Sequence, residues 1–233
     1  MTDDVKPLDG PRHGVAAGTQ ARALVVFLHG LGADGNDLIS LAPLLESVLP
    51  DTAFASPHAP WPCDMAPMGR QWFSLQERDP DVLLEGVRDA APLLNAFLDQ
   101  ELKALGLTDD RLALVGFSQG TMTARHTALR RPRACALVVG FSGALLKPEV
   151  LGNEIVSRPP VLLVHGDADD VVPFEALAMA EEGLQLNGVP VAAYRRPGLG
   201  HGIDNEGLQL AAIALVQHLF PETLAAAGEQ PGG

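Results

Sequence analysis

Short apolar runs alternate with stretches of helical pattern along most of the chain. The runs are rich in β-branched residues and predict buried strands at Ala23–Leu28, Thr52–Ala55, Arg111–Val115, Ala134–Val139, Val161–Val164 and Val189–Tyr194. Strands that are apolar on both faces are typical of parallel sheets, which carry helices on each side. The pattern therefore predicts an α/β fold, with a mostly parallel central sheet and helices on both faces.

One long helix is indicated between the second and third of these strands. Apolar residues there lie three to five positions apart, which places them roughly on one face: Leu83, Val87, Ala90, Leu94, Phe97, Leu102 and Leu105. Pro92 predicts either a kink in this helix or a late start. Further helices are expected after Asp37, Ser118, Pro173 and Asp204, and the last should reach about Phe220.

The ends of the chain differ in composition from its middle. Residues 1–20 are rich in Gly, Pro and polar residues, which predicts an irregular arm with room for an edge strand. Residues 21–220 are expected to form a single domain and residues 221–233 a flexible tail. Within the domain, the segment from Pro57 to Asp81 lacks clear periodicity, and long loops inside compact domains are commonly functional.

Composition and charge narrow the classes of function. Hydrophobic residues make up 47% of the 233 residues and charged residues 19%, as in packed globular proteins. The formal net charge of −13 disfavours nucleic acid and anionic lipid as partners. The N-terminus lacks a signal-peptide pattern and no apolar run is long enough to span a membrane, so a cytoplasmic protein without membrane insertion is expected. Cys63 and Cys135 are too few for a disulfide framework, and no metal site is expected.

The segment Gly116-Phe117-Ser118-Gln119-Gly120 has the pattern G-x-S-x-G. It stands where a predicted strand meets a helical segment, which is the context in which this pattern forms a nucleophile elbow. In such a turn the serine adopts strained backbone angles and its hydroxyl stands clear of the sheet. The sequence therefore predicts Ser118 as a nucleophile, with an ordinary serine at a helix N-terminus as the alternative.

A nucleophilic serine needs a histidine to accept its proton and a carboxylate to orient that histidine. In this type of fold the acid and then the base follow the serine, on loops at the carboxyl ends of later strands. The strand at 161–164 runs into a segment with Asp167, Asp169 and Asp170, and the next strand is followed by His201 between two glycines. These positions predict a triad of Ser118, Asp169 and His201, with motif position favouring Asp169 among the three carboxylates.

Six other histidines compete for the role of base. His58 is the second choice. The remaining ones are expected to pack, to face solvent or to brace loops: His13, His29, His126, His165 and His218.

The segment Leu28-His29-Gly30-Leu31-Gly32 follows the first strong strand, where this fold places one half of its oxyanion hole. The N–H groups of Leu31 and Gln119 are expected to donate to the developing oxyanion. A Gly-rich turn that caps a helix is the alternative. The segment matches neither common phosphate-binding pattern, so no nucleotide cofactor is expected.

Together, four segments resemble the phospholipase/carboxylesterase group of α/β-hydrolases, which includes acyl-protein thioesterases. They are residues 28–35, 116–120, 165–173 and 200–202. The resemblance covers roughly residues 20–220 and implies an α/β-hydrolase fold without a separate cap domain. It gives Ser118 as nucleophile, Asp169 as acid, His201 as base, and Leu31 and Gln119 as oxyanion donors. It is also compatible with a homodimer.

One segment departs from the acyl-protein thioesterases. They read Trp-Phe-Asp where this chain has Trp72-Phe73-Ser74, and residues 63–71 look like those of bacterial carboxylesterases. The leading hypothesis is hydrolysis of small-molecule carboxylic esters through an acyl-enzyme, with no cofactor. A thioesterase or lysophospholipase, or a ligand-binding protein on the hydrolase fold, stays open as an alternative.

The aperiodic loop is expected to line the substrate pocket, since ligand sites are usually lined by apolar and aromatic side chains. The candidate wall residues are Trp61, Met65, Met68, Trp72 and Phe73. A satellite core cluster is the alternative interpretation.

Overall fold

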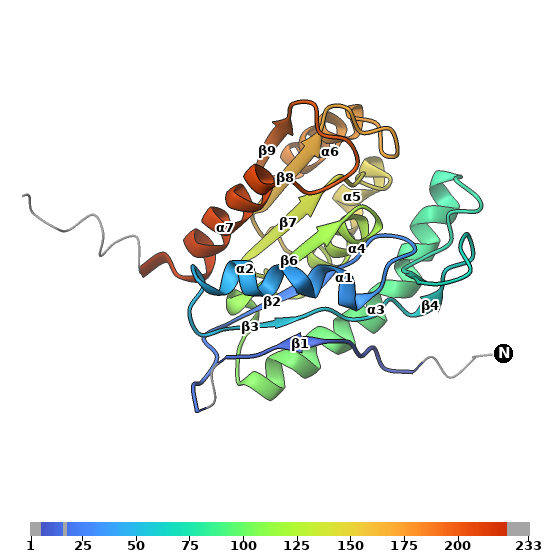
Figure 1. Cartoon of the computed structure of the whole chain (residues 1–233). Helices are drawn as coiled ribbons and strands as arrows, with labels where there is room; N and C mark the ends of the chain where they lie inside the picture. The colour runs from blue at the N-terminus through green and yellow to red at the C-terminus, as the bar shows by residue number, and fades with distance from the viewer. Residues whose placement is uncertain (1–5, 16–17, 223–233) are drawn as a thin grey trace, which may run out of the picture.

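A seven-stranded sheet forms the centre of the computed structural model, which describes residues 6–15 and 18–222 (Figure 1). The strands are β1 (Arg12–His13), β2 (Ala23–Leu28), β3 (Thr52–Ala55), β6 (Leu112–Phe117), β7 (Leu137–Phe141), β8 (Val161–Gly166) and β9 (Val191–Arg196). Their order across the sheet is β1-β3-β2-β6-β7-β8-β9, and every neighbouring pair is parallel except β1 and β3. The predicted mostly parallel sheet is confirmed, and the arm does contribute an edge strand, β1.

Helices cover both faces of this sheet, as expected (Figure 1). They are α1 (Gly35–Leu38), α2 (Ala42–Glu46), α3 (Pro80–Leu105), α4 (Gln119–Ala128), α5 (Pro148–Glu154), α6 (Glu175–Leu186) and α7 (Asn205–Leu219). Side chains of β2 alternate between two core clusters because successive residues of a strand point to opposite faces. Leu24 and Val26 belong to the core cluster that also contains residues of α3, α4, α5 and α6, whereas Val25 and Phe27 belong to the cluster with residues of α1, α2 and α7.

The central strands continue further than the sequence pattern predicts. β6 ends at Phe117 rather than Val115, and β7 at Phe141 rather than Val139. Glycine weakens a strand pattern, yet Gly116 and Gly140 pair with each other in the ladder. The candidate catalytic segments therefore begin inside the sheet, and its rigid backbone sets where they start.

One expectation about an individual element is wrong, and one of the two alternatives for Pro92 is excluded. The strand near residue 190 was expected to be buried, but β9 is the open edge of the sheet and its residues alternate between partly buried and exposed. The helix α3 has no late start at Pro92, since it runs through Pro92 from residue 80 to residue 105. Pro92 is exposed, and Arg88, whose carbonyl lacks an N–H partner because of Pro92, is partly exposed.

The aperiodic segment 57–81 carries a small hairpin of β4 (Trp61–Pro62) and β5 (Arg70–Gln71), which the sequence did not predict. The helix expected after Asp37 is confirmed as α1, the short turn Ile39–Leu41 and α2, whereas α5 was not predicted. Most of the expected C-terminal tail, residues 223–233, lies outside the described residues. In the part of the chain that the structure describes, no helix combines the length and apolar character of a transmembrane span.

Candidate active site

Ser118 occupies a sharp turn between β6 and α4, as the motif predicts. Its backbone angles are φ 53° and ψ −118°, a conformation that costs free energy for any residue other than glycine. The Ser118 amide donates to the Phe141 carbonyl of β7 at 2.9 Å, which anchors the turn to the sheet. A side chain at Gly120 would collide with the Leu28 carbonyl, so only glycine allows α4 to start this close to β2. The strain is therefore held in place by the surrounding backbone.

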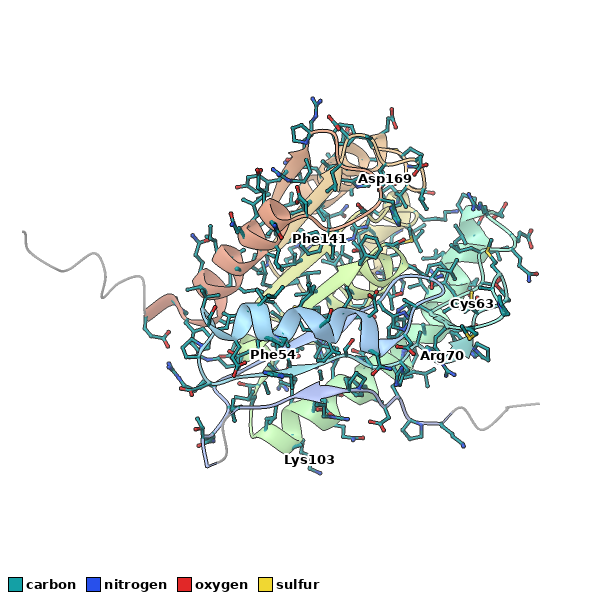
Figure 2. The ribbon with its side chains drawn as sticks, in the orientation of Figure 1. Phe54, Cys63, Arg70, Lys103, Phe141 and Asp169 are labelled. Atoms are coloured by element: carbon teal, nitrogen blue, oxygen red, sulfur yellow. The ribbon has the colours of Figure 1, made fainter. Side chains whose placement is uncertain are left out.

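The candidate acid and base come together at the carboxyl ends of β8 and β9. Asp169, labelled in Figure 2, accepts a hydrogen bond on Oδ2 from Nδ1 of His201 at 2.8 Å. Phe117, the residue before Ser118, packs against the His201 imidazole with ring centroids 4.8 Å apart. This bond leaves Nε2 of His201 as the nitrogen that is free to take a proton from a nucleophile.

The Asp169 side chain is fully buried, and its hydrogen bonds favour the ionised carboxylate. Burial alone would raise its pKa, but the hydrogen bond from His201 and those from the Val172 and Val171 amides outweigh it and lower the pKa below the usual value. Both amides donate to Oδ1 at 2.9 Å, while Oδ2 serves His201. The loop thus fixes one oxygen and leaves the other to orient the imidazole.

The neighbouring carboxylates have other environments. Asp167 accepts from the Gly198 amide at 2.6 Å and from Nε of Arg195 at 2.7 Å, so it ties the β8 loop to the loop that leads to His201. Asp170 is exposed. Of the three carboxylates, Asp169 is the one that the structure joins to His201.

His165 is a neighbour of the candidate acid Asp169 that sequence reasoning did not connect with it. Its Nε2 is 2.9 Å from the Val172 carbonyl and 3.3 Å from Oδ2 of Asp169. The side chain is buried and braces the loop, as was expected from its position at a strand end. The spacing of His165 and Asp169 along the chain is the signal that could have found this contact.

The two candidate oxyanion donors lie on either side of Ser118 in the fold. Gln119 is the first residue of α4, where an amide has no partner within the helix, and Leu31 stands in the turn after β2. Within residues 6–15 and 18–222, neither amide donates a hydrogen bond. Both are therefore free to bind an oxyanion.

A strap of residues 69–73, from β5 and its flanks, connects the two segments that carry these amides. At the Leu31 side, Arg70 exchanges two backbone hydrogen bonds with the turn: Gly32 N–H to Arg70 C=O at 2.9 Å, and Arg70 N–H to Ala33 C=O at 2.8 Å. A side chain at Gly69 would collide with the Gly32 carbonyl. The strap and the oxyanion turn are thus in close backbone contact.

At the Gln119 side, the strap is held by side chains. The side-chain carboxamide of Gln119 accepts a hydrogen bond from the backbone N–H of Trp72 at 2.8 Å. It donates one to the Phe73 carbonyl at 2.7 Å. The Trp72 indole N–H donates to the His29 carbonyl at 3.0 Å. The strap, which includes Arg70 in Figure 2, therefore links the elbow to the oxyanion turn.

For two of the expected wall residues, the structure supports the alternative of a core cluster. The Trp72 side chain exposes 0% of its surface and Phe73 exposes 2%, and both lie in the core. The indole can be buried without loss because its N–H donates to the His29 carbonyl. A fully buried ring cannot touch a substrate. Trp61 is half-buried against the same core, whereas Met65 and Met68 are exposed.

An open pocket of about 320 Å³ lies on another side of the site, next to His201. Leu41, Phe117 and Ile203 belong to its apolar walls. None of the expected wall residues lines it. The pocket was missed from the sequence because the positions that form it come from three distant segments.

A sequence model of the phospholipase/carboxylesterase family matches residues 14–219. The chain belongs to this family. A probable carboxylesterase SOBER1-like of Arabidopsis thaliana is 30% identical to it, over 86% of this chain and 80% of that protein. Acyl-protein thioesterase 1 of Gibberella zeae is 28% identical, over 88% of this chain and 94% of that protein.

Solved structures agree with the family. The crystal structure of esterase PE8 superposes with a TM-score of 0.87 and 41% sequence identity, covering 92% of this chain and 100% of that one. The fold is therefore the α/β-hydrolase fold, and a member of this family is an ester-hydrolysing enzyme.

Proposed function

We propose that the chain is a serine carboxylesterase that hydrolyses carboxylic esters through an acyl-enzyme on Ser118. The observation that carries this proposal is the bond from His201 to the buried Asp169, together with the contact of His201 with Phe117, which directly precedes Ser118 in its strained turn. A strained backbone costs stability, and the desolvation of a buried carboxylate has to be offset by hydrogen bonds; the two features recur together where catalysis needs them.

In the proposed reaction, His201 takes the proton of Ser118 as Oγ attacks the ester carbonyl carbon. The carbonyl oxygen becomes negative and accepts hydrogen bonds from the Leu31 and Gln119 amides. The imidazolium, stabilised by Asp169, then gives its proton to the alkoxide that leaves. Water repeats the sequence on the acyl-enzyme, releases the acid and restores Ser118.

Carboxylic esters are favoured over the other substrates of the family for two reasons. The solved structure with 41% identity is that of an esterase, whereas the relative named as a thioesterase is 28% identical. The chain also has Ser74 where acyl-protein thioesterases carry aspartate, as noted above. Thioester hydrolysis remains the second candidate because the triad does not distinguish the two leaving groups.

Replacement of Ser118 by alanine tests the function. We expect kcat for 4-nitrophenyl esters to fall by a factor on the order of 10⁴ or more, since alanine fits the turn but cannot attack. The unfolding midpoint should not fall, because alanine is no larger than serine. Ser47→Ala, at an exposed serine beyond α2, is the matched control and should keep full activity.

Wild-type rates on an ester and a thioester with the same acyl group then separate the two candidates. A clear preference for the thioester would replace carboxylesterase by thioesterase. Near wild-type ester hydrolysis by Ser118→Ala would contradict the proposed mechanism itself.

A further inference from the structure

The pocket beside His201 has a defined place in the fold. One side of the pocket is formed by the short helix α1 and the turn Ile39–Leu41 that follows it. The other side is formed by the loop that leads from His201 into α7. Its volume of about 320 Å³ is near the lower end of the range for small-molecule sites, roughly 300 to 1,000 Å³. A small organic group fits such a space, whereas a folded protein surface does not.

The geometry of acyl transfer decides which part of an ester this pocket receives. The carbonyl oxygen has to face the Leu31 and Gln119 amides, and neither residue lines the pocket. The leaving oxygen has to come within about 3 Å of the imidazole nitrogen that protonates it. Because Nδ1 of His201 is held by Asp169, that nitrogen is Nε2. The group attached to the leaving oxygen therefore lies beside His201, where the pocket is.

The lining also selects by polarity and charge. Leu41, Phe117 and Ile203 offer an apolar surface, and Asp37 and Ser40 are the polar side chains at the exposed side. No lysine or arginine is among the described residues that line the pocket. Within residues 6–15 and 18–222, the Asp37 carboxylate has no ion-pair partner, so its charge acts on whatever enters.

We propose that this pocket binds the alcohol part of the ester, and that it takes an apolar alcohol of up to about aromatic-ring size that is neutral or positively charged. An alcohol that carries a phosphate or carboxylate is disfavoured by Asp37 and finds no cationic partner. The inference rests on the proposed ester hydrolysis. It adds a leaving-group specificity that argues against lysophospholipids whose leaving group carries a net negative charge.

The size selection can be tested with esters of one acid, such as methyl, phenyl and 2-naphthyl butyrate. In Leu41→Trp the larger side chain fills the pocket, and kcat/KM for the naphthyl ester should fall at least about tenfold more than kcat/KM for the methyl ester. Leu41→Ala should shift the preference towards the naphthyl ester. Comparing each variant with wild type on the same ester cancels the intrinsic reactivity of the esters. Leu44→Trp, at an exposed leucine of α2 outside the pocket, is the control.

The charge selection is tested with phenyl esters that carry a trimethylammonium or a carboxylate group. Asp37→Lys should change the ratio of their kcat/KM values by about fivefold or more in favour of the anionic ester at low ionic strength. Added salt should reduce the change because Asp37 is exposed and its field is screened.

The outcomes separate this inference from the proposed function. If wild type hydrolyses the esters but both Leu41 variants keep the wild-type leaving-group profile, the inference is overturned and the function stands. If the variants instead change the preference for acyl-chain length with a fixed alcohol, the pocket binds the acyl group and the inference is again overturned. If wild type hydrolyses none of the esters, the proposed function fails first.

Discussion

Asp169 divides its two carboxylate oxygens between the backbone of its own loop and His201, the proposed base. Oδ1 takes the Val171 and Val172 amides, and Oδ2 takes His201. An asparagine here can keep one of these functions but not both, because its amide nitrogen donates where a carboxylate oxygen accepted. The residue therefore sets both the loop and the tautomer of the base.

Three asparagine variants separate Asp169 from its neighbours. We expect Asp169→Asn to lower kcat by about 10⁴-fold, as in the corresponding change in a serine protease, because the imidazole is held in the wrong tautomer. Asp167→Asn should act mainly on the unfolding temperature, since Asp167 ties together two loops. Asp170→Asn should change neither kcat nor the unfolding temperature, because Asp170 is exposed.

The measurement is kcat together with the midpoint of thermal unfolding for each variant. A large loss of kcat in Asp167→Asn, with Asp169→Asn nearly unaffected, would overturn the assignment of the acid.

At the scale of elements, the strap 69–73 ties the oxyanion turn to the elbow through Gln119. Gln119→Met keeps the backbone amide but leaves the Trp72 N–H and the Phe73 carbonyl buried without partners. We expect a loss of stability of about 1–3 kcal/mol and a fall in kcat with little change in KM, because the two oxyanion amides lose their fixed separation.

Gln76→Met, at an exposed glutamine of the same loop, is the matched control. Denaturant unfolding and steady-state kinetics check the prediction. If Gln119→Met is destabilised but keeps the wild-type kcat, the strap has only a structural role.

The sequence predicted these elements unevenly, for physical reasons. Most strands and the loops after β6, β8 and β9 could be predicted, because apolar runs mark the strands and parallel strands bring their carboxyl ends to one edge. The order of the strands across the sheet was not predicted. The burial of Trp72 in the core could not be predicted, because the pattern of an aperiodic loop does not show whether an apolar residue faces a pocket or the core. The pocket beside His201 depends on three separate segments, and only the folded chain brings them together.

At the scale of the whole molecule, buried histidines couple stability to pH. Burial, together with the nearby Arg130 and Arg88, lowers the pKa of His126 from 6.5 to about 3, although Glu154 opposes the shift. Burial also lowers the pKa of His29 and of His218. The unfolded chain therefore binds more protons than the folded one between about pH 6.5 and pH 3, so stability falls as the pH falls through this window.

Below pH 6.5, we expect His126 to lower the free energy of unfolding of wild type by up to about 1.4 kcal/mol for each pH unit. His126→Gln should show a shallower fall between pH 6.5 and pH 4.5, where carboxylates with lowered pKa values stay ionised. Urea unfolding at several pH values checks this, with His13→Gln as a control at a more exposed histidine that bonds to Glu46. Parallel curves for wild type and His126→Gln would contradict the prediction.

Covalent trapping of the serine tests the central claim most directly. Diethyl 4-nitrophenyl phosphate transfers its phosphoryl group to an activated serine oxygen and releases 4-nitrophenolate, so the release counts active sites while mass spectrometry locates the label. We predict one equivalent of nitrophenolate per chain, the label on the peptide that contains Ser118, no label in Ser118→Ala and a rate at least about 10³-fold lower in His201→Ala. No stoichiometric release, or a label on another residue while Ser118 stays free, would contradict the account.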